Sequence, residues 1–303
     1  MDENQWLADR FEQQRGHLRA VAYRMLGSLA EADDAVQDTW LRVSRAGADE
    51  VENLRGWLTT VTARVCLNML RSRNVRREEP VGVHVPDPVI TAGGPLQPEE
   101  EVLLADSVGL ALQVVLDTLT PAERLAFVLH DMFELPFEEI APMVGRTPAA
   151  ARQLASRARR RVKGAEIPVP DPDVAGQREV VDAFLAAARG GDFDALVAVL
   201  DPGVVVRIDA GAARPAASMA IRGAEAVARQ ALTGLTSALR VAHLYPALVN
   251  GAAGVVVTMS GRPVAVLGFT IVNGKIAEID SIADPERVRT LTAAVLNDIH
   301  PCG

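Results

Sequence analysis

The 303-residue chain is poor in cysteine and lacks any long apolar run. Its two cysteines, Cys66 and Cys302, show neither a disulfide framework nor the close spacing of a metal or redox motif. We find no signal peptide and no segment long enough to cross a membrane. These absences favour a cytoplasmic protein in a reducing compartment, and we expect neither a metal site nor a cofactor.

Acidic side chains are missing from one stretch of an otherwise acidic chain. The formal net charge is −8, yet residues 146–163 carry seven basic residues and no acid. Gly145 is placed to end one short helix, and Thr147 with Pro148 is placed to begin the next. Apolar stripes on both segments complete a predicted helix-turn-helix, in which Pro142 should kink or shorten the first helix. The alternative is a solvated basic face on a packed hairpin.

A basic second helix of this kind is suited to the major groove of DNA. Arginine and glutamine side chains pair with base edges, and the basic end of the helix suits phosphates. The residues predicted to contact DNA are Arg146, Thr147, Pro148, Arg152, Gln153, Ser156, Arg157, Arg159 and Arg160.

Two helices predicted near the N-terminus carry further polar stripes. On the helix over 31–43, an acidic stripe that ends in a leucine is either solvated or a docking face for a basic helix. On the helix over 54–73, an aromatic residue, two arginines and an amide share one face, which suits unstacked single-stranded bases. Burial of Trp57 with the arginines at the surface is the alternative for this second stripe.

Two proline-rich segments divide the chain. Residues 80–98 contain five prolines and three glycines in nineteen positions, which predicts a semi-extended linker without a core. A second joint covers 165–175. Beyond it we predict two helices, a strand, a third helix and strands at 240–249, 254–260, 263–272 and 275–282. This order predicts an α+β domain with a curved antiparallel sheet wrapped on helices.

Four motifs of the first half resemble, in order and spacing, the extracytoplasmic-function (ECF) group of RNA polymerase sigma factors. They are EADDAVQDTWLRV, NLRGWLTTVTARVCLNMLRSR, LTPAERLAFVLHDMFELPFEEIA and RTPAAARQLASRARRRV. The resemblance implies an all-α region 2 domain at 1–79, a linker at 80–99 along the RNA path of polymerase, and a region 4 helix-turn-helix domain at 100–164. It implies a factor that directs transcription initiation at specific promoters.

The resemblance also implies roles for the polar stripes. The helix after Thr147 would read the minus-35 element. The residues implied to bind the clamp of the β′ subunit of core RNA polymerase are Asp33, Asp34, Gln37, Asp38 and Leu41. The residues implied to bind the minus-10 element are Trp57, Arg64, Asn68, Arg71 and Arg73.

The second half is similar to the SnoaL-like branch of the nuclear-transport-factor-2 (NTF2) fold, most clearly in DAFLAAARGGDFDALVAVLDPGVVVRID. The resemblance implies a cone-shaped SnoaL-like domain at 176–283, followed by a tail at 284–303 that is helical through Ile299. It implies a regulator in cis that is not an enzyme, with a pocket for a small hydrophobic ligand. The residues implied to regulate or to line a pocket are Asp209, Gly211, His243, Tyr245, Asp280, Asp284 and Pro285.

Two other functions are compatible with these patterns. A ligand-responsive one-component transcription factor would bind operators through the helix-turn-helix without polymerase. A SnoaL-type isomerase or hydrolase would carry the DNA-binding part as a passenger, but fold alone does not establish catalysis. A requirement for core polymerase separates the sigma factor from the first alternative, and turnover of a ring substrate would support the second.

Overall fold

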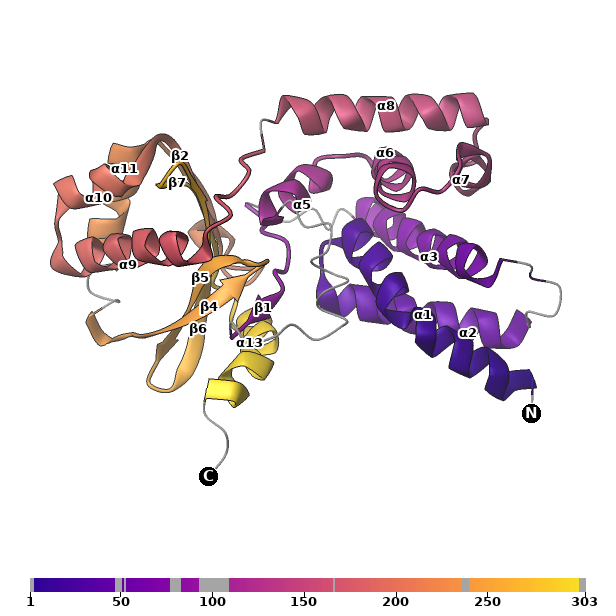
Figure 1. Cartoon of the computed structure of the whole chain (residues 1–303), viewed down its shortest axis with the longest axis horizontal. Helices are drawn as coiled ribbons and strands as arrows, with labels where there is room; N and C mark the ends of the chain where they lie inside the picture. Colours follow the sequence, from indigo (N-terminus) through magenta and orange to yellow (C-terminus); the bar gives the residue numbers. More distant parts are fainter. Residues whose placement is uncertain are drawn as a thin grey trace. The chain divides into compact units, whose positions relative to one another are not determined.

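A computed structural model describes residues 3–46, 51, 53–76, 83–92, 109–165, 167–235 and 240–299. These residues form two compact units (Figure 1). The first unit contains the described residues within 1–79 and 111–167, and the second contains those within 80–96, 107–110 and 168–303. No helix in the described part of the chain is long and apolar enough to span a bilayer.

Three long helices begin the first unit: α1 (Glu3–Leu26), α2 (Leu29–Ala46) and α3 (Leu54–Arg76). Their predicted inward stripes are buried, as Phe11, Leu18 and Val36 show. The Phe11 ring also packs on the half-buried Trp40, with 5.1 Å between the ring centroids. The helical class predicted for this segment is therefore confirmed.

The rest of the first unit is a second group of helices: α5 (Gly109–Asp117), α6 (Pro121–Phe127), the π-helical turn η1 (Val128–Met132), α7 (Phe137–Val144) and α8 (Pro148–Gly164). Helix α7 ends two residues after Pro142 and is followed by Gly145 at φ +64°. The Thr147 hydroxyl then accepts a hydrogen bond from the Ala150 N–H and caps α8. The predicted helix-turn-helix is therefore present.

The two helical groups pack on each other within the first unit. The carbonyls in the last turn of α1 have acceptor capacity to spare, and side chains from the second group donate to them. Arg124 Nε donates to the carbonyl of Arg24 at 3.0 Å, and Gln113 Nε2 donates to that of Tyr23 at 3.2 Å. Both donors are buried, so the end of α1 is completed by α5 and α6.

The second unit is an α+β domain, as predicted. Its helices are α9 (Val174–Gly190), α10 (Phe193–Val199), α11 (Ala224–Gln230) and α13 (Pro285–Ile299), with short turns η2 (Pro215–Ala217) and η3 (Ala231–Leu235). Its long strands are β2 (Leu200–Asp209), β4 (His243–Val249), β5 (Ala252–Met259), β6 (Arg262–Val272) and β7 (Lys275–Ile282), and short strands β1 (Ile90–Thr91) and β3 (Met219–Arg222) complete the sheet.

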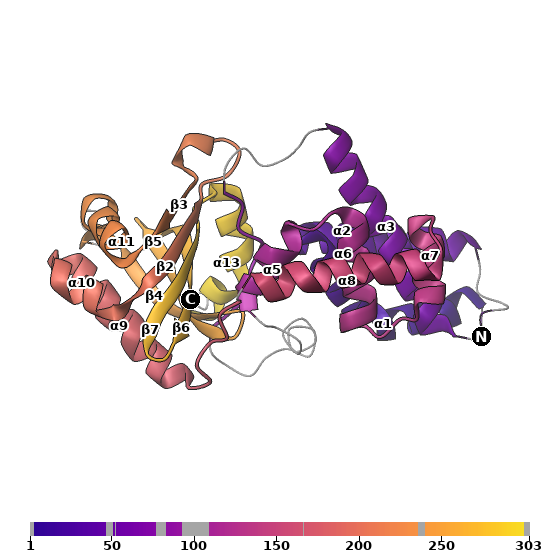
Figure 2. The same ribbon diagram turned by 90° about the horizontal axis from the view of Figure 1, so that it is seen from above.

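The strand order is β1-β4-β5-β6-β7-β2-β3, antiparallel except where β2 runs parallel to β7. Helices α9, α10 and α11 lie on one face of the sheet, and α13 lies on the other (Figures 1 and 2). Because side chains alternate along a strand, each face has its own apolar cluster. Ile279 belongs to the cluster under α9–α11, and Ile282 belongs to the cluster under α13.

The described part of the proline-rich linker differs from our expectation. We predicted a connector without a core, but residues 83–92 belong to the second unit, and Ile90–Thr91 pairs antiparallel with β4 at the edge of the sheet. Val85, Val89 and Ile90 are buried. Proline is tolerated in an edge strand because one side of that strand needs no ladder donors. The apolar residues between the prolines therefore bind the sheet.

Candidate DNA interface and linker-binding site

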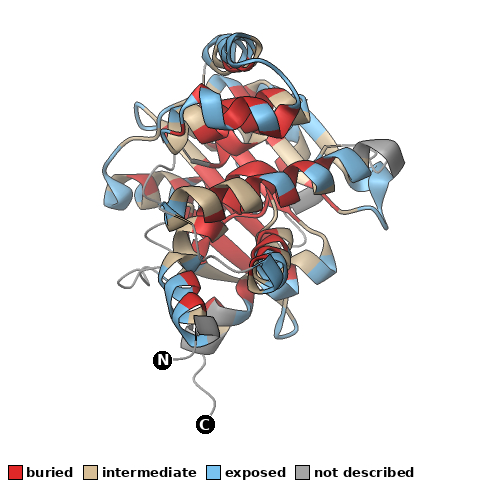
Figure 3. Ribbon diagram, turned by 90° about the vertical axis from the view of Figure 1, so that its right-hand side faces the viewer, coloured by how far each residue is buried: buried red, intermediate tan, exposed pale blue. Residues whose placement is uncertain are grey.

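Helix α8 presents a basic surface. Ala151, Ala155 and Ala158 are buried on its inner side, whereas its outer side is exposed (Figure 3). Arg159 is half-buried, and its Nε lies 2.5 Å from a carboxylate oxygen of Asp131. Arg159 is therefore engaged within the protein. The predicted DNA-contacting residues that are exposed are Arg146, Thr147, Pro148, Arg152, Gln153, Ser156, Arg157 and Arg160.

The residues predicted to bind the minus-10 element differ in their exposure on α3. Arg64, Asn68 and Arg71 are exposed and lie one helical turn apart, while Trp57 is half-buried. Arg73 instead forms an ion pair with Glu31 of α2, and its guanidinium lies 3.4 Å from the carbonyl of Leu26. Arg73 thus joins α3 to the end of α1 and the start of α2.

The acidic stripe of α2 lies on the surface. Asp34 and Gln37 are exposed, and Leu41 keeps 44% of its surface accessible. Asp33 forms an ion pair with Arg19 of α1 at 2.6 Å, and Asp38 forms one with Arg42 at 2.8 Å.

The second unit binds the linker through one arginine of α13. Arg287 donates from Nε and Nη2 to Asp87 Oδ1 at 2.9 and 2.6 Å, and from Nη2 to the carbonyl of Val85 at 2.6 Å. Its Nη1 donates to Asp209 Oδ2 at the end of β2, at 2.6 Å. Three segments far apart in the sequence therefore meet at a single guanidinium.

Asp209 is the buried acceptor of this network. Its Oδ2 also accepts from the backbone N–H of Val85 at 3.0 Å and lies 3.1 Å from His84 Nδ1. Burial alone would raise the pKa of Asp209, but the hydrogen bonds from His84 and Val85 and the charge of Arg287 outweigh it and hold the pKa well below its usual range. Asp209 is therefore ionised when the linker is bound.

Three further predicted residues shape this site. Asp284 caps α13, because its Oδ1 accepts from the backbone N–H groups of Glu286 and Arg287 at 3.0 and 2.9 Å. Pro285 is the first residue of that helix. Gly211 has φ +78°, and a Cβ there would collide with the Asp284 carboxylate. A side chain at 211 would displace the cap that positions Arg287.

Sequence reasoning predicted Asp209, Gly211, Asp284 and Pro285 but missed the residues that bind them. His84 and Asp87 lie in the proline-rich segment that we interpreted as a free linker, and Arg287 lies one turn into the tail. The alternation of valines with polar residues before Ile90 was a usable strand signal, since edge strands tolerate proline. Nothing local connects Asp87 to Arg287, which is 200 residues away.

The other predicted pocket residues do not converge. His243 is exposed and Tyr245 is half-buried on β4, whereas Asp280 lies on β7 and Asp209 on β2. Strands β5 and β6 separate β4 from β7, so His243 and Tyr245 lie three strand positions away from Asp280 in the sheet. Asp209 and Asp280 also face α13 and the linker rather than the apolar cluster under α9–α11. Four groups so arranged do not form one acid–base site.

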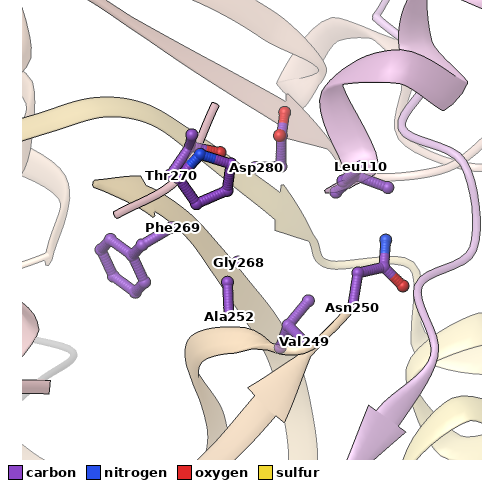
Figure 4. A pocket seen from close by; sticks show the side chains of 9 residues that line it. Leu110, Val249, Asn250, Ala252, Gly268, Phe269, Thr270 and Asp280 are labelled. Atoms are coloured by element: carbon purple, nitrogen blue, oxygen red, sulfur yellow. The ribbon is translucent and has the colours of Figure 1, made fainter. Parts of the chain in front are cut away.

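Asp280 borders a small cavity of its own, with Val249, Gly268 and Leu110 in the lining (Figure 4). The cavity volume is about 20 Å³, which is room for about one water molecule. Burial raises the pKa of Asp280 to about 6, although Arg207 Nη1 donates to its Oδ1 at 3.0 Å and opposes the shift. Arg207 also pairs with Glu278 at 2.8 Å, so one cation serves two buried carboxylates.

We predict that the Asp280→Asn substitution stabilises the second unit at pH 8 and not at pH 4. Because the pKa of Asp280 is raised in the fold, its contribution to stability is full below the unfolded pKa near 4 and is lost as the pH rises through about 6. The amide removes that loss, worth about 1–3 kcal/mol. Thermal melts of both proteins at the two pH values measure it, and an equal shift at both would contradict the assignment.

The first unit presents a basic recognition helix in a helix-turn-helix, and the α+β unit binds the linker. This combination defines a DNA-binding transcription factor. Family models agree with this class: Sigma-70 region 2 matches residues 10–76, and Sigma-70 region 4 matches residues 109–162.

The chain is 39% identical over 287 residues to the ECF RNA polymerase sigma factor SigJ of Mycobacterium tuberculosis, with 91% of each chain covered. It is 36% identical over 282 residues to the probable ECF sigma factor SigI of the same species, with coverages of 92% and 93%. The crystal structure of SigJ superimposes with a TM-score of 0.70 over 94% of this chain and 98% of that one, at 35% identity. The chain therefore belongs to the ECF RNA polymerase sigma factors, and its α+β unit follows region 4 as a C-terminal extension.

Proposed function

We propose that the SnoaL-like extension regulates this sigma factor in cis by binding the linker between regions 2 and 4. The observation that carries the proposal is the Arg287 network, in which α13 and β2 bind residues 84–87 while β4 pairs with Ile90 and Thr91. The family resemblance implies that this linker follows the RNA path of polymerase during initiation. One segment cannot occupy that path and the edge of the sheet at once.

The extension is joined to region 4 by a short segment, and this connection makes weak contacts effective. The linker and the extension belong to one chain, so their binding is intramolecular and gains an effective concentration. Binding of the linker then needs only modest affinity to be populated, and core polymerase can compete for the same segment. We infer an equilibrium between a state with the linker bound to the extension and a state with the linker free to engage polymerase.

The sigma domains supply the remaining proposed contacts. We assign the α2 stripe to the β′ clamp, the exposed residues of α3 to the minus-10 element and those of α8 to the minus-35 element. The domain boundaries 1–79, 100–164 and 176–283, the cytoplasmic location and the non-catalytic nature of the extension are part of the same proposal. A small apolar ligand in the extension stays a prediction.

The first test is transcription in vitro with core RNA polymerase, comparing the full chain with a fragment that ends near Lys163. A promoter-specific transcript from either protein supports the initiation role, and a difference between them assigns regulation to the extension, with its sign separating inhibitor from activator. Equal transcription at every promoter would contradict regulation in cis. DNA binding without any transcript would favour the one-component transcription factor.

Two neighbouring arginines of α8 should differ in their contribution to DNA binding. We expect Arg160→Ala to reduce the salt dependence of promoter binding by about one phosphate contact, because Arg160 is exposed. Arg159→Ala should change that slope much less, because Asp131 already engages its guanidinium. Binding titrations of both variants over a range of salt concentrations measure the slopes, and equal losses would contradict this assignment.

Substitution of Arg287 should release the linker while the extension remains in place. Arg287→Met leaves Asp209 and Asp87 without their shared cation, at a cost of about 1–3 kcal/mol. The N–H of Val85 bonds to Asp209, and that of Asn250 bonds to the carbonyl of Val89. Amide hydrogen exchange at both positions should accelerate about 5- to 150-fold.

Arg289→Met is the matched control, because Arg289 is exposed on the same helix. Transcription by the Arg287→Met variant should exceed that of the unsubstituted full chain, because the released linker is free to engage polymerase. Faster exchange with unchanged transcription would separate linker binding from regulation and overturn the proposal.

A further inference from the structure

One aromatic ring lies beneath the recognition helix and contacts two cationic or titratable side chains. Phe137, the first residue of α7, is 6% exposed. The guanidinium carbon of Arg152 lies 5.2 Å from its ring centroid, which is cation–π range. The imidazole of His130 stacks on the same ring, with 3.9 Å between centroids and 30° between the ring planes.

The turn before α7 fixes the position of this ring without any help from DNA. Nδ1 of His130 lies 2.9 Å from the carbonyl oxygen of Leu135, and since a carbonyl only accepts, Nδ1 carries the proton. The backbone N–H of Leu135 bonds to the carbonyl of Leu129 at 2.8 Å, and Glu134 turns the chain at φ +57°. The π-helical turn η1 therefore holds His130 against Phe137.

Arg152 differs from other arginines of its helix. Arg159 and Arg161 pair with Asp131 and Glu123, whereas Arg152 is exposed and has no hydrogen bond or ion pair to any residue that the structure describes. Stacking uses the flat face of a guanidinium and leaves its in-plane N–H donors free. Arg152 is the fifth residue of α8, in the part of a recognition helix that reaches base edges.

We propose that Phe137 is a positioning residue that aligns the Arg152 guanidinium for bidentate recognition of a purine base. The purine is guanine, because guanine presents two acceptors in the major groove. The contact confines a long, flexible side chain before DNA arrives, so less conformational entropy is lost when the base is bound. The inference rests on the minus-35 role proposed for Arg152 and adds that sequence discrimination depends on a ring that does not itself contact DNA.

The test uses holoenzyme assembled from the full chain and core RNA polymerase. It is incubated with duplex promoter fragments in which the minus-35 window is randomised, and the bound fragments are sequenced. Arg152→Ala should lower discrimination at one base pair by about 5- to 150-fold. Phe137→Leu should lower discrimination at the same base pair by about 2- to 5-fold, and Phe137→Tyr, which keeps the ring, should retain it.

The double variant separates positioning from general damage to the fold. When Arg152 is already alanine, Phe137→Leu should cause no further loss at that base pair. A similar loss in both backgrounds, or a loss spread evenly over all positions, would show a structural role and overturn the inference. If Arg152→Ala leaves the selected sequence unchanged, the DNA-reading role fails. If Arg152→Ala changes the selected DNA sequence and Phe137→Leu does not, the DNA-reading role of Arg152 stands and the positioning role of Phe137 is refuted.

Discussion

The guanidinium of Arg287 is the interaction on which the proposed regulation depends. It connects Asp87 of the linker, Asp209 of β2 and the first turn of α13, and two carboxylates share its charge. Buried ion pairs are costly to form and still more costly to break when one partner is removed. Such a cluster adds little net stability to a fold, but it specifies which segment binds beside α13 and the end of β2.

Apolar burial gives this polar cluster its place. Val85 and Ile90 belong to the same buried cluster as Val249, Val256 and Ile282. The linker therefore completes a hydrophobic face of the sheet as well as a charge network. Departure of the linker would expose that face. It would also remove the Val85 N–H donor from Asp209, which would keep only Arg287 as its cationic partner. Linker binding is thus coupled to the packing of α13 rather than confined to the strand edge.

The local features of this fold could be predicted because their causes are local. Thr147, Pro148 and Gly145 define the helix-turn-helix by cap chemistry and backbone conformation, and the alternating strands of the extension follow the period of their apolar residues. The bound linker could not be predicted in the same way. Its prolines indicate a connector, and the features that attract it, Asp209 and Arg287, are far away in the sequence.

The candidate site shows the same division. Exposure of Arg152, Gln153 and Arg160 follows from helical periodicity, which places them opposite the buried alanines of α8. The pairing of Arg159 with Asp131 and of Arg73 with Glu31 depends on how helices pack, and no spacing rule reveals it. Asp209 and Asp280 were predicted as polar groups of one pocket, but partners on neighbouring strands and on the linker determine their roles.

The most direct test of the account is to fix the linker to the sheet. Ile90 and Val249 are register partners in β1 and β4, so cysteines at both positions can be joined by a disulfide. Burial raises the pKa of the Cys66 thiol to about 12 and keeps it unreactive, and Cys302 is replaced by serine. Transcription with core polymerase is then measured before and after reduction. The account predicts that the cross-linked protein yields less promoter-specific transcript and that reduction restores it. Equal transcription from a fully cross-linked and a reduced protein would contradict linker binding as the regulatory step.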